Sequence, residues 1–201
     1  MAMILASQSP RRRELLGQMG FSFTVRPAKG EELPHPELTP AQLVEELARQ
    51  KALEVSAEAA SDDVVVAADT VVAIDGVVLG KPHDKVHAAQ MLSALSGREH
   101  TVYTGVAVKR GETLLVEHEA TQVRFRPLTQ REIDLYIQTG EPMDKAGSYG
   151  IQGCGALLVE GIRGDYFNVV GLPICRLGRM LAQVGEDALA QCAQKCAEKE
   201  R

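Results

Sequence analysis

The segment Leu5–Leu16, with the sequence LASQSPRRRELL, combines residue types that could bind a phosphate group. Ser9 is a favourable N-cap and Pro10 suits the first helical position, so a helix should begin here. The first turn of a helix offers unpaired backbone N–H groups and the positive end of the helix dipole, and both attract anions. The arginines that follow add fork-shaped donors that match phosphate oxygens. The alternative is an ordinary solvated basic helix start.

The three arginines cannot all face one ligand, because successive helical residues are rotated by about 100°. We expect Arg11 and Arg12 to face the ligand and Arg13 to lie outside it. Three adjacent arginines also stand out in a chain whose formal net charge is -5. The contrast favours an anion site over a generally basic surface.

Asp69 is the most conspicuous single residue, because it interrupts the apolar run VVVAADTVVAI. An unpaired carboxylate in such a buried strand would cost several kcal/mol. Either backbone donors satisfy the carboxylate, or Asp69 opens onto a cleft, where it could bind a metal ion or activate water. The residues alone leave both interpretations open.

A predicted hairpin brings Lys81 towards the same strand. Asp75 and Gly76 form a strong two-residue turn, and counting back from them places Thr70 opposite Lys81. The residues alone favour neither a solvated strand-edge lysine nor a phosphate contact.

Three further features have an ordinary explanation when the residues are taken alone. Glu31 and Glu32 are adjacent loop carboxylates that are usually solvated, although Mg²⁺ needs only one or two carboxylates besides substrate phosphates. Lys51 lies on a predicted helix, where a surface lysine is the ordinary expectation. The glycine-rich loop DKAGSYGIQGCG lacks the features of a P-loop or a dinucleotide fingerprint, so by itself it indicates only sharp bends and a close approach.

Alternating and helical patterns predict the elements that position these residues. The predicted strands are Ile4–Ala6, Phe21–Val25, Val64–Ile74, the VVLG return after the turn, Thr101–Lys109, Thr113–Phe125, about Ala156–Ile162 and about Phe167–Val170. The predicted helices are Arg11–Met19, Pro40 to about Ala59, Lys85–Leu95, Thr129 to about Ile137 and Pro173 to about Val184. This pattern predicts one α/β (mixed α+β) domain over residues 1–184, built around a long, twisted mixed sheet flanked by helices. Residues 185–201 should form a polar, frayed or semi-detached helical tail.

Composition limits the class of protein. The chain has 201 residues, of which 45% are hydrophobic and 24% charged, enough for one well-buried domain. Its acidic balance argues against a nucleic-acid binder. The apolar run MILA is too short for a signal peptide or a membrane span, so a cytoplasmic location is expected.

Four motifs in order, ASQSPRR, ADT, GKP and DKAGSYGIQG, resemble those of the Maf family of nucleoside triphosphate pyrophosphatases. The resemblance runs from Ile4 to about Leu177. It implies an inosine-triphosphatase-like fold and an enzyme that cleaves a nucleoside triphosphate between the α and β phosphates, as a house-cleaning step for the nucleotide pool. It also implies a divalent metal (Mg²⁺, Mn²⁺ or Co²⁺) and a homodimer.

The resemblance also assigns roles to individual residues. Asp69 matches the family's proposed proton acceptor, and Glu32 matches a functional acid that would hold the metal together with Asp69. Gln152, in the glycine-rich loop, would read the base. The expected phosphate contacts are Ser7, Arg11, Arg12, Lys51 and Lys81, and Lys81 is also expected to be catalytic together with Asp69.

Within the family, Arg11, Thr70 and Gln152 match the branch that prefers dTTP and UTP. The branch that prefers 7-methyl-GTP has an aromatic residue, Gln and Glu at these positions. A Gln amide both donates and accepts, as the edge of uracil or thymine requires. The competing hypothesis is a nucleotide-binding regulator of cell division without significant catalysis, which would not need Asp69.

Overall fold

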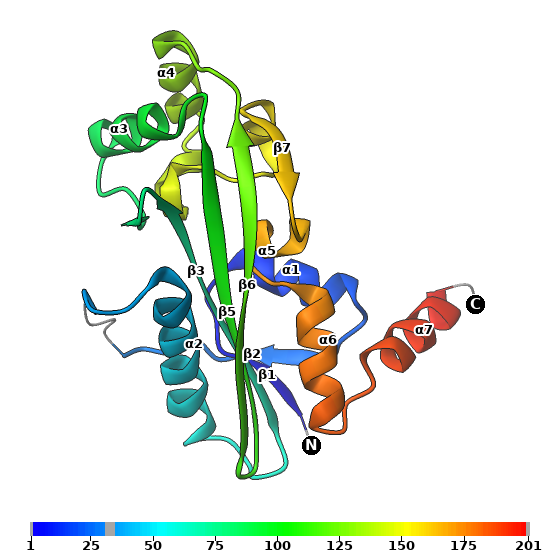
Figure 1. The fold of residues 1–201 in the computed structure, drawn as a ribbon. Helices are drawn as coiled ribbons and strands as arrows, with labels where there is room; N and C mark the ends of the chain where they lie inside the picture. The colour runs from blue at the N-terminus through cyan, green and yellow to red at the C-terminus, as the bar shows by residue number, and fades with distance from the viewer. Residues whose placement is uncertain (1, 31–34, 200–201) are drawn as a thin grey trace.

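The computed structural model describes residues 2–30 and 35–199, and within them one mixed sheet of seven strands forms the centre of the molecule (Figure 1). The sheet order is β2-β1-β3-β5-β6-β7, with β4 paired to β3. The strands are β1 Met3–Leu5, β2 Phe23–Val25, β3 Val64–Ile74, β4 Val77–Leu79, β5 Glu99–Arg110, β6 Thr113–Phe125 and β7 Val159–Arg163. The predicted mixed sheet flanked by helices is confirmed.

Helices cover both faces of this sheet (Figure 1). They are α1 Pro10–Gln18, α2 Pro40–Ser56, α3 Lys85–Leu95, α4 Gln130–Gln138, α5 Tyr166–Val170, α6 Ile174–Gln183 and α7 Ala188–Lys199. Three short 3₁₀ segments, η1 Glu141–Asp144, η2 Ala146–Ser148 and η3 Gly153–Leu157, make up most of the predicted glycine-rich loop.

Strand β3 is buried on both faces, as the sequence predicted, because its alternate side chains enter two different cores. Val64, Val66 and Ala68 pack with the apolar residues of α1 and α6. Val65 and Ala67 pack with the small and β-branched residues of α2. A third core, between the far ends of β3, β5 and β6 and the helices α3 and α4, extends the molecule away from α2 and α6 (Figure 1).

The predicted strand at about Phe167–Val170 is wrong, since this segment forms the helix α5. The Asp165 side chain caps that helix by accepting from the Phe167 N–H at 2.8 Å, and Gly171 ends it at φ 118°. Capping and the burial of Asn168 therefore override the strand preference of the valines. The neighbouring strand β7 also begins later than predicted, because η3 occupies Gly153–Leu157.

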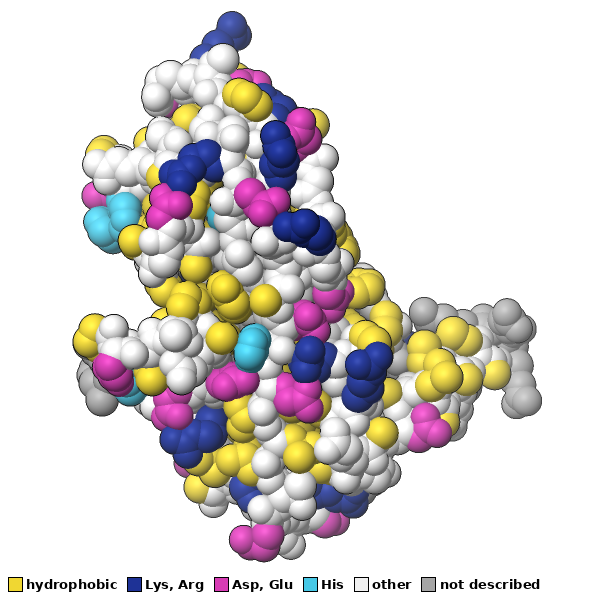
Figure 2. Space-filling view, viewed as in Figure 1, with side chains coloured by type: hydrophobic (Ala, Val, Ile, Leu, Met, Phe, Trp, Pro, Cys, Tyr) yellow, Lys and Arg dark blue, Asp and Glu magenta, His cyan; other side chains and the backbone are white. Residues whose placement is uncertain are grey.

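The described part of the tail is helical, and Lys195 Nζ donates to the Gly17 carbonyl oxygen at 2.5 Å, which ties α7 to the end of α1. On the face shown in Figure 2, basic and acidic side chains lie next to each other. Ion pairs among the described residues include Arg124 with Glu160 at 2.8 Å and Arg176 with Glu119 at 2.9 Å. Across residues 2–30 and 35–199, no helix is long and apolar enough to cross a membrane.

Candidate active site

The candidate site lies where β3 changes its partner along one edge. β1 pairs in parallel with Val64–Val66, and β4 pairs antiparallel with Val72–Ile74, while β5 covers the opposite edge from Val65 to Ala73. In the described structure no strand pairs with Ala67–Val71 on the first edge. Because β1 and β4 approach this gap from opposite directions, the residues that follow both strands are delivered to it. The gap opens into a cavity of about 840 Å³.

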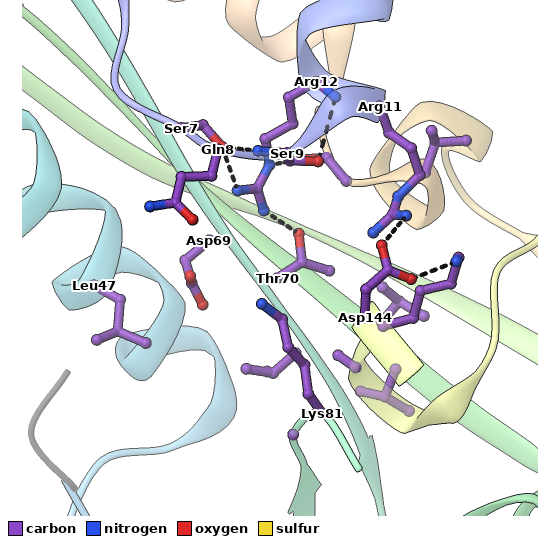
Figure 3. Close-up of a pocket in the computed structure, with 18 of the residues that line it drawn as sticks. Ser7, Gln8, Ser9, Arg11, Arg12, Leu47, Asp69, Thr70, Lys81 and Asp144 are labelled. Atoms are coloured by element: carbon purple, nitrogen blue, oxygen red, sulfur yellow. Dashed lines mark hydrogen bonds and ion pairs between the residues drawn. The ribbon is translucent and has the colours of Figure 1, made fainter. Parts of the chain in front are cut away.

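The hairpin register is the predicted one. Val72 pairs with Leu79, and continuing that register places Thr70 opposite Lys81. The strand β4 ends at Leu79, so the Lys81 side chain is released from the sheet, and it points toward Asp69 and Thr70 (Figure 3).

Asp69 and Thr70 are the two residues of β3 that are only partly buried, and both line the cavity. Asp69 points to the face covered by α2, where its Oδ1 accepts from Lys51 Nζ at 2.5 Å. The side chains of Asp69 and Lys51 are 14% and 20% exposed. No donor among the described residues makes a hydrogen bond to Oδ2 of Asp69. This oxygen can therefore accept a proton or bind a metal ion in the cavity.

Gly105 allows α2 to approach Asp69. It is the cross-strand partner of Asp69 on β5. A Cβ atom on Gly105 would lie 2.1 Å from the Val44 carbonyl oxygen of α2, which is far inside van der Waals contact. The missing side chain therefore sets the depth at which Lys51 meets Asp69.

Arg12 is fixed on the other side of the strand. Its Nη2 donates to Thr70 Oγ1 at 2.9 Å, its Nη1 to Ser7 Oγ at 3.2 Å, and its Nε to the Gly171 carbonyl oxygen at 2.8 Å (Figure 3). Ser9 caps the helix as predicted, accepting from the Arg12 N–H at 3.5 Å. The start of α1 and a held guanidinium thus face the cavity together.

Arg11 reaches the opposite rim and pairs with Asp144 at 3.1 Å (Figure 3). Arg13 is exposed and lies outside the cavity lining. Asp144 also accepts from Lys145 Nζ at 2.6 Å. Partial burial alone would raise the pKa of Asp144, but the hydrogen bonds from Lys145 and Arg11 outweigh it and lower this pKa. Asp144 is thus a stable anion that joins α1 to the glycine-rich loop.

The glycine-rich loop is anchored to the hairpin. The Gly147 N–H donates to the Gly80 carbonyl oxygen at 3.0 Å, and a Cβ on Gly147 would lie 2.8 Å from the Val72 side chain. Gly147 also has φ 66°, so a glycine is needed for both conformation and space. This anchoring brings Gln152 to the cavity lining, with its side chain exposed.

Most residues predicted for the site therefore line one cavity: Ser7, Arg11, Arg12, Lys51, Asp69, Thr70, Lys81 and Gln152. Glu31 and Glu32 lie outside the described residues. Asp144 and Gly171 were not predicted from the sequence. Asp144 begins the DKAGSYGIQG motif, which was a usable signal, whereas nothing local marks the Gly171 carbonyl oxygen as a partner of Arg12.

Comparison with known proteins identifies the family. The model of the family described as Maf-like protein matches residues 2–184. The chain belongs to the Maf family. This Maf chain is 54% identical over 184 residues to a protein named dTTP/UTP pyrophosphatase from Symbiobacterium thermophilum, covering 91% of this chain and 94% of that protein. It is also 54% identical over 188 residues to one of the same name from Moorella thermoacetica, covering 92% and 96%.

A solved structure of a nucleoside-triphosphatase, also titled dITP/XTP pyrophosphatase, from Mycobacterium abscessus matches 92% of this Maf chain and 94% of its own chain. Its TM-score is 0.44 and its sequence identity is 18%.

Proposed function

We propose that this chain hydrolyses nucleoside triphosphates, with dTTP and UTP preferred, to the nucleoside monophosphate and pyrophosphate. The observation that supports this most is the composition of the cavity: besides Asp144, which is paired at the rim with Arg11 and Lys145, the carboxylate of Asp69 lies among basic side chains in a chain of net charge -5. The arginine and lysine side chains of the lining are Arg11, Arg12, Lys51, Lys81 and Lys145. Such a site suits a polyanion attacked by water, and the relatives named above are dTTP/UTP pyrophosphatases.

In the proposed reaction Asp69 accepts the proton of the attacking water through Oδ2. Lys51 holds Oδ1 at 2.5 Å and so fixes the orientation of the carboxylate. Lys81, which points toward Asp69 and has an exposed side chain, would contact the phosphates from the end of β4. These positions are compatible with water attacking the α phosphorus while pyrophosphate leaves.

The start of α1 would bind the two phosphates that leave as pyrophosphate and carry most of the charge. Ser7 Oγ already accepts from the Ser9 N–H and from Arg12 Nη1, both at 3.2 Å. Its hydroxyl proton can therefore be donated to a phosphate oxygen. The guanidinium of Arg12, the start of the helix and Ser7 together stabilise negative charge that grows on the leaving group.

The carboxylate of Asp69 fits a divalent cation that binds together with the phosphates of the nucleotide. Within residues 2–30 and 35–199 no group of three or more His, Cys, Asp or Glu side chains could hold a metal ion. Mg²⁺, however, is commonly held by one or two carboxylates plus substrate phosphates. Asp69 supplies one such carboxylate, and Glu32, outside the described residues, is the proposed second. When bound, the ion would neutralise phosphate charge and polarise the phosphorus–oxygen bonds.

Gln152 is the proposed base reader. The described residues give its side chain no hydrogen bond, so its donor and its acceptor are both available to a uracil or thymine edge. The role of Thr70 would be indirect, because its hydroxyl already contacts Arg12 and Thr104. Arg11, at the rim beside Asp144, would act between the phosphates and the base of the substrate.

The test is product analysis across a panel of dTTP, UTP, dCTP, ATP and GTP with Mg²⁺. We expect nucleoside monophosphate and pyrophosphate in equal amounts, fastest from dTTP and UTP. Release of diphosphate and inorganic phosphate would contradict the proposed bond cleavage. Nucleotide binding without any hydrolysis would favour the regulator of cell division.

The homodimer and the cytoplasmic location stay predictions. Sedimentation velocity of the purified protein tests whether it is a homodimer.

A further inference from the structure

A buried chain of hydrogen bonds runs from the guanidinium of Arg12 into the interior of the protein. Thr70 and Thr104 are cross-strand partners on β3 and β5, and their hydroxyl oxygens lie 2.9 Å apart. Thr104 Oγ1 donates to the Asn168 carbonyl oxygen at 3.0 Å. Because a hydroxyl has one proton, Thr70 must donate to Thr104, which leaves Thr70 free to accept from Arg12 Nη2. The direction of every bond in the chain is thereby fixed.

The chain ends on a residue that is itself held rigidly. Asn168 Nδ2 donates to the Val102 carbonyl oxygen at 3.0 Å and to Thr121 Oγ1 at 2.9 Å. Thr104, Thr121 and Asn168 are each 0% exposed. In such surroundings an unpaired polar group is costly, so the arrangement resists rearrangement.

Arg12 is consequently attached to α5 by two routes. The first is direct, from Nε to the Gly171 carbonyl oxygen at 2.8 Å. The second runs through Thr70 and Thr104 to the carbonyl oxygen of Asn168. A guanidinium is planar, so two attachments at different nitrogens set the orientation of its plane.

We propose that Thr104 and Asn168 are positioning residues that orient the Arg12 guanidinium for the phosphates of the substrate. This inference rests on the proposed function, in which Arg12 binds those phosphates. Neither residue lines the cavity, so neither is expected to touch the substrate. Their effect on turnover passes through Arg12.

The test is a double-mutant cycle with Thr104→Val and Arg12→Ala. Thr104→Val keeps the shape of the side chain but removes the hydroxyl between Thr70 and Asn168. We expect it to lower kcat/KM for dTTP about tenfold in the wild-type background and to have no further effect in the Arg12→Ala background. Thr104→Ser, which keeps the hydroxyl, should retain kcat/KM within about twofold. An additive cycle, or equal loss in Thr104→Ser and Thr104→Val, would overturn the proposal.

A matched control and a binding readout separate positioning from folding. Thr101 lies on the same strand, and the described residues give its hydroxyl no hydrogen bond, so Thr101→Val should leave kcat/KM unchanged. Titration calorimetry with inorganic pyrophosphate across the same four proteins of the cycle needs no turnover. If the wild-type chain hydrolyses no nucleotide, the proposed function fails, while a non-additive loss of pyrophosphate affinity still supports the positioning role. Absence of pyrophosphate binding by the wild type would overturn that role.

Discussion

Replacing Gly105 with alanine should uncouple Lys51 from Asp69 without touching either residue. The new Cβ would lie 2.1 Å from the Val44 carbonyl oxygen and 2.8 Å from the Glu45 nitrogen. Both are backbone atoms of α2, so no side-chain rotation can relieve the clash. Restoring a tolerable carbon–oxygen contact requires α2 and β5 to move apart by about 1 Å. Lys51 is part of α2 and would move with it, so its 2.5 Å hydrogen bond to Asp69 would be lost.

A displacement of about 1 Å in a catalytic site costs on the order of 100-fold in rate. We therefore expect Gly105→Ala to lower kcat/KM for dTTP by about 100-fold. Overpacking of this kind also lowers the free energy of unfolding by about 1–3 kcal/mol. The assay is pyrophosphate release under first-order conditions, together with urea unfolding of the same preparation.

Gly161→Ala is the matched control, because Gly161 also lies on a strand and a Cβ there meets no atom within 4 Å. It should change neither activity nor stability appreciably. If Gly105→Ala were to keep wild-type kcat/KM while folded, the close approach of α2 would have no catalytic importance and the reasoning would be refuted.

The remaining predictions concern the base, the metal and pH. Gln152→Glu should erode the preference for dTTP and UTP over dCTP, because a carboxylate cannot donate to the O4 carbonyl; an unchanged kcat/KM profile would place base reading elsewhere. Chelation of divalent cations should abolish turnover, and Glu32→Ala should raise the Mg²⁺ concentration needed for half-maximal rate; full turnover in EDTA would exclude a metal. Burial lowers the pKa of His100 from 6.5 to about 4, so the unfolded chain binds the extra proton first as the pH falls. The free energy of unfolding of the wild type should fall by roughly 2 kcal/mol between pH 7 and pH 4.5. Urea unfolding of His100→Gln should show no such fall, and an equal pH dependence in both proteins would contradict the prediction.

Local patterns in the sequence predicted the parts of the fold that are specified locally. The helices α2 and α4 begin at capping boxes that Thr39 forms with Gln42 and Thr129 forms with Glu132. These helix starts, the Asp75-Gly76 turn and the apolar run of β3 each depend on residues close together in the chain. The hairpin register follows from that turn alone. For this reason the sequence alone predicted that Asp69, Thr70 and Lys81 lie close together.

The rest depends on contacts between distant segments. Thr104 meets Asn168 across 64 residues, and Arg12 meets Gly171 across 159 residues. Asn168 lies in a segment that was predicted as a strand from its valines, although it is the helix α5, and Gly171 is the residue that ends this helix. Nothing near Gly105 in the sequence reveals that α2 packs against it. The residues that hold the site were therefore harder to predict than the residues that form it.

The most direct test of the proposed function is the turnover number of Asp69→Asn on dTTP, measured by pyrophosphate release at saturating substrate and Mg²⁺. Asparagine keeps the shape of the side chain and can still contact Lys51 through its amide oxygen, but it is not a base and has no charge. We expect kcat to fall by a factor on the order of 1,000, while calorimetry should show that dTTP still binds to the folded protein. A kcat within a few-fold of the wild type would show that Asp69 is only a buried structural acid and that the cavity does not work as proposed.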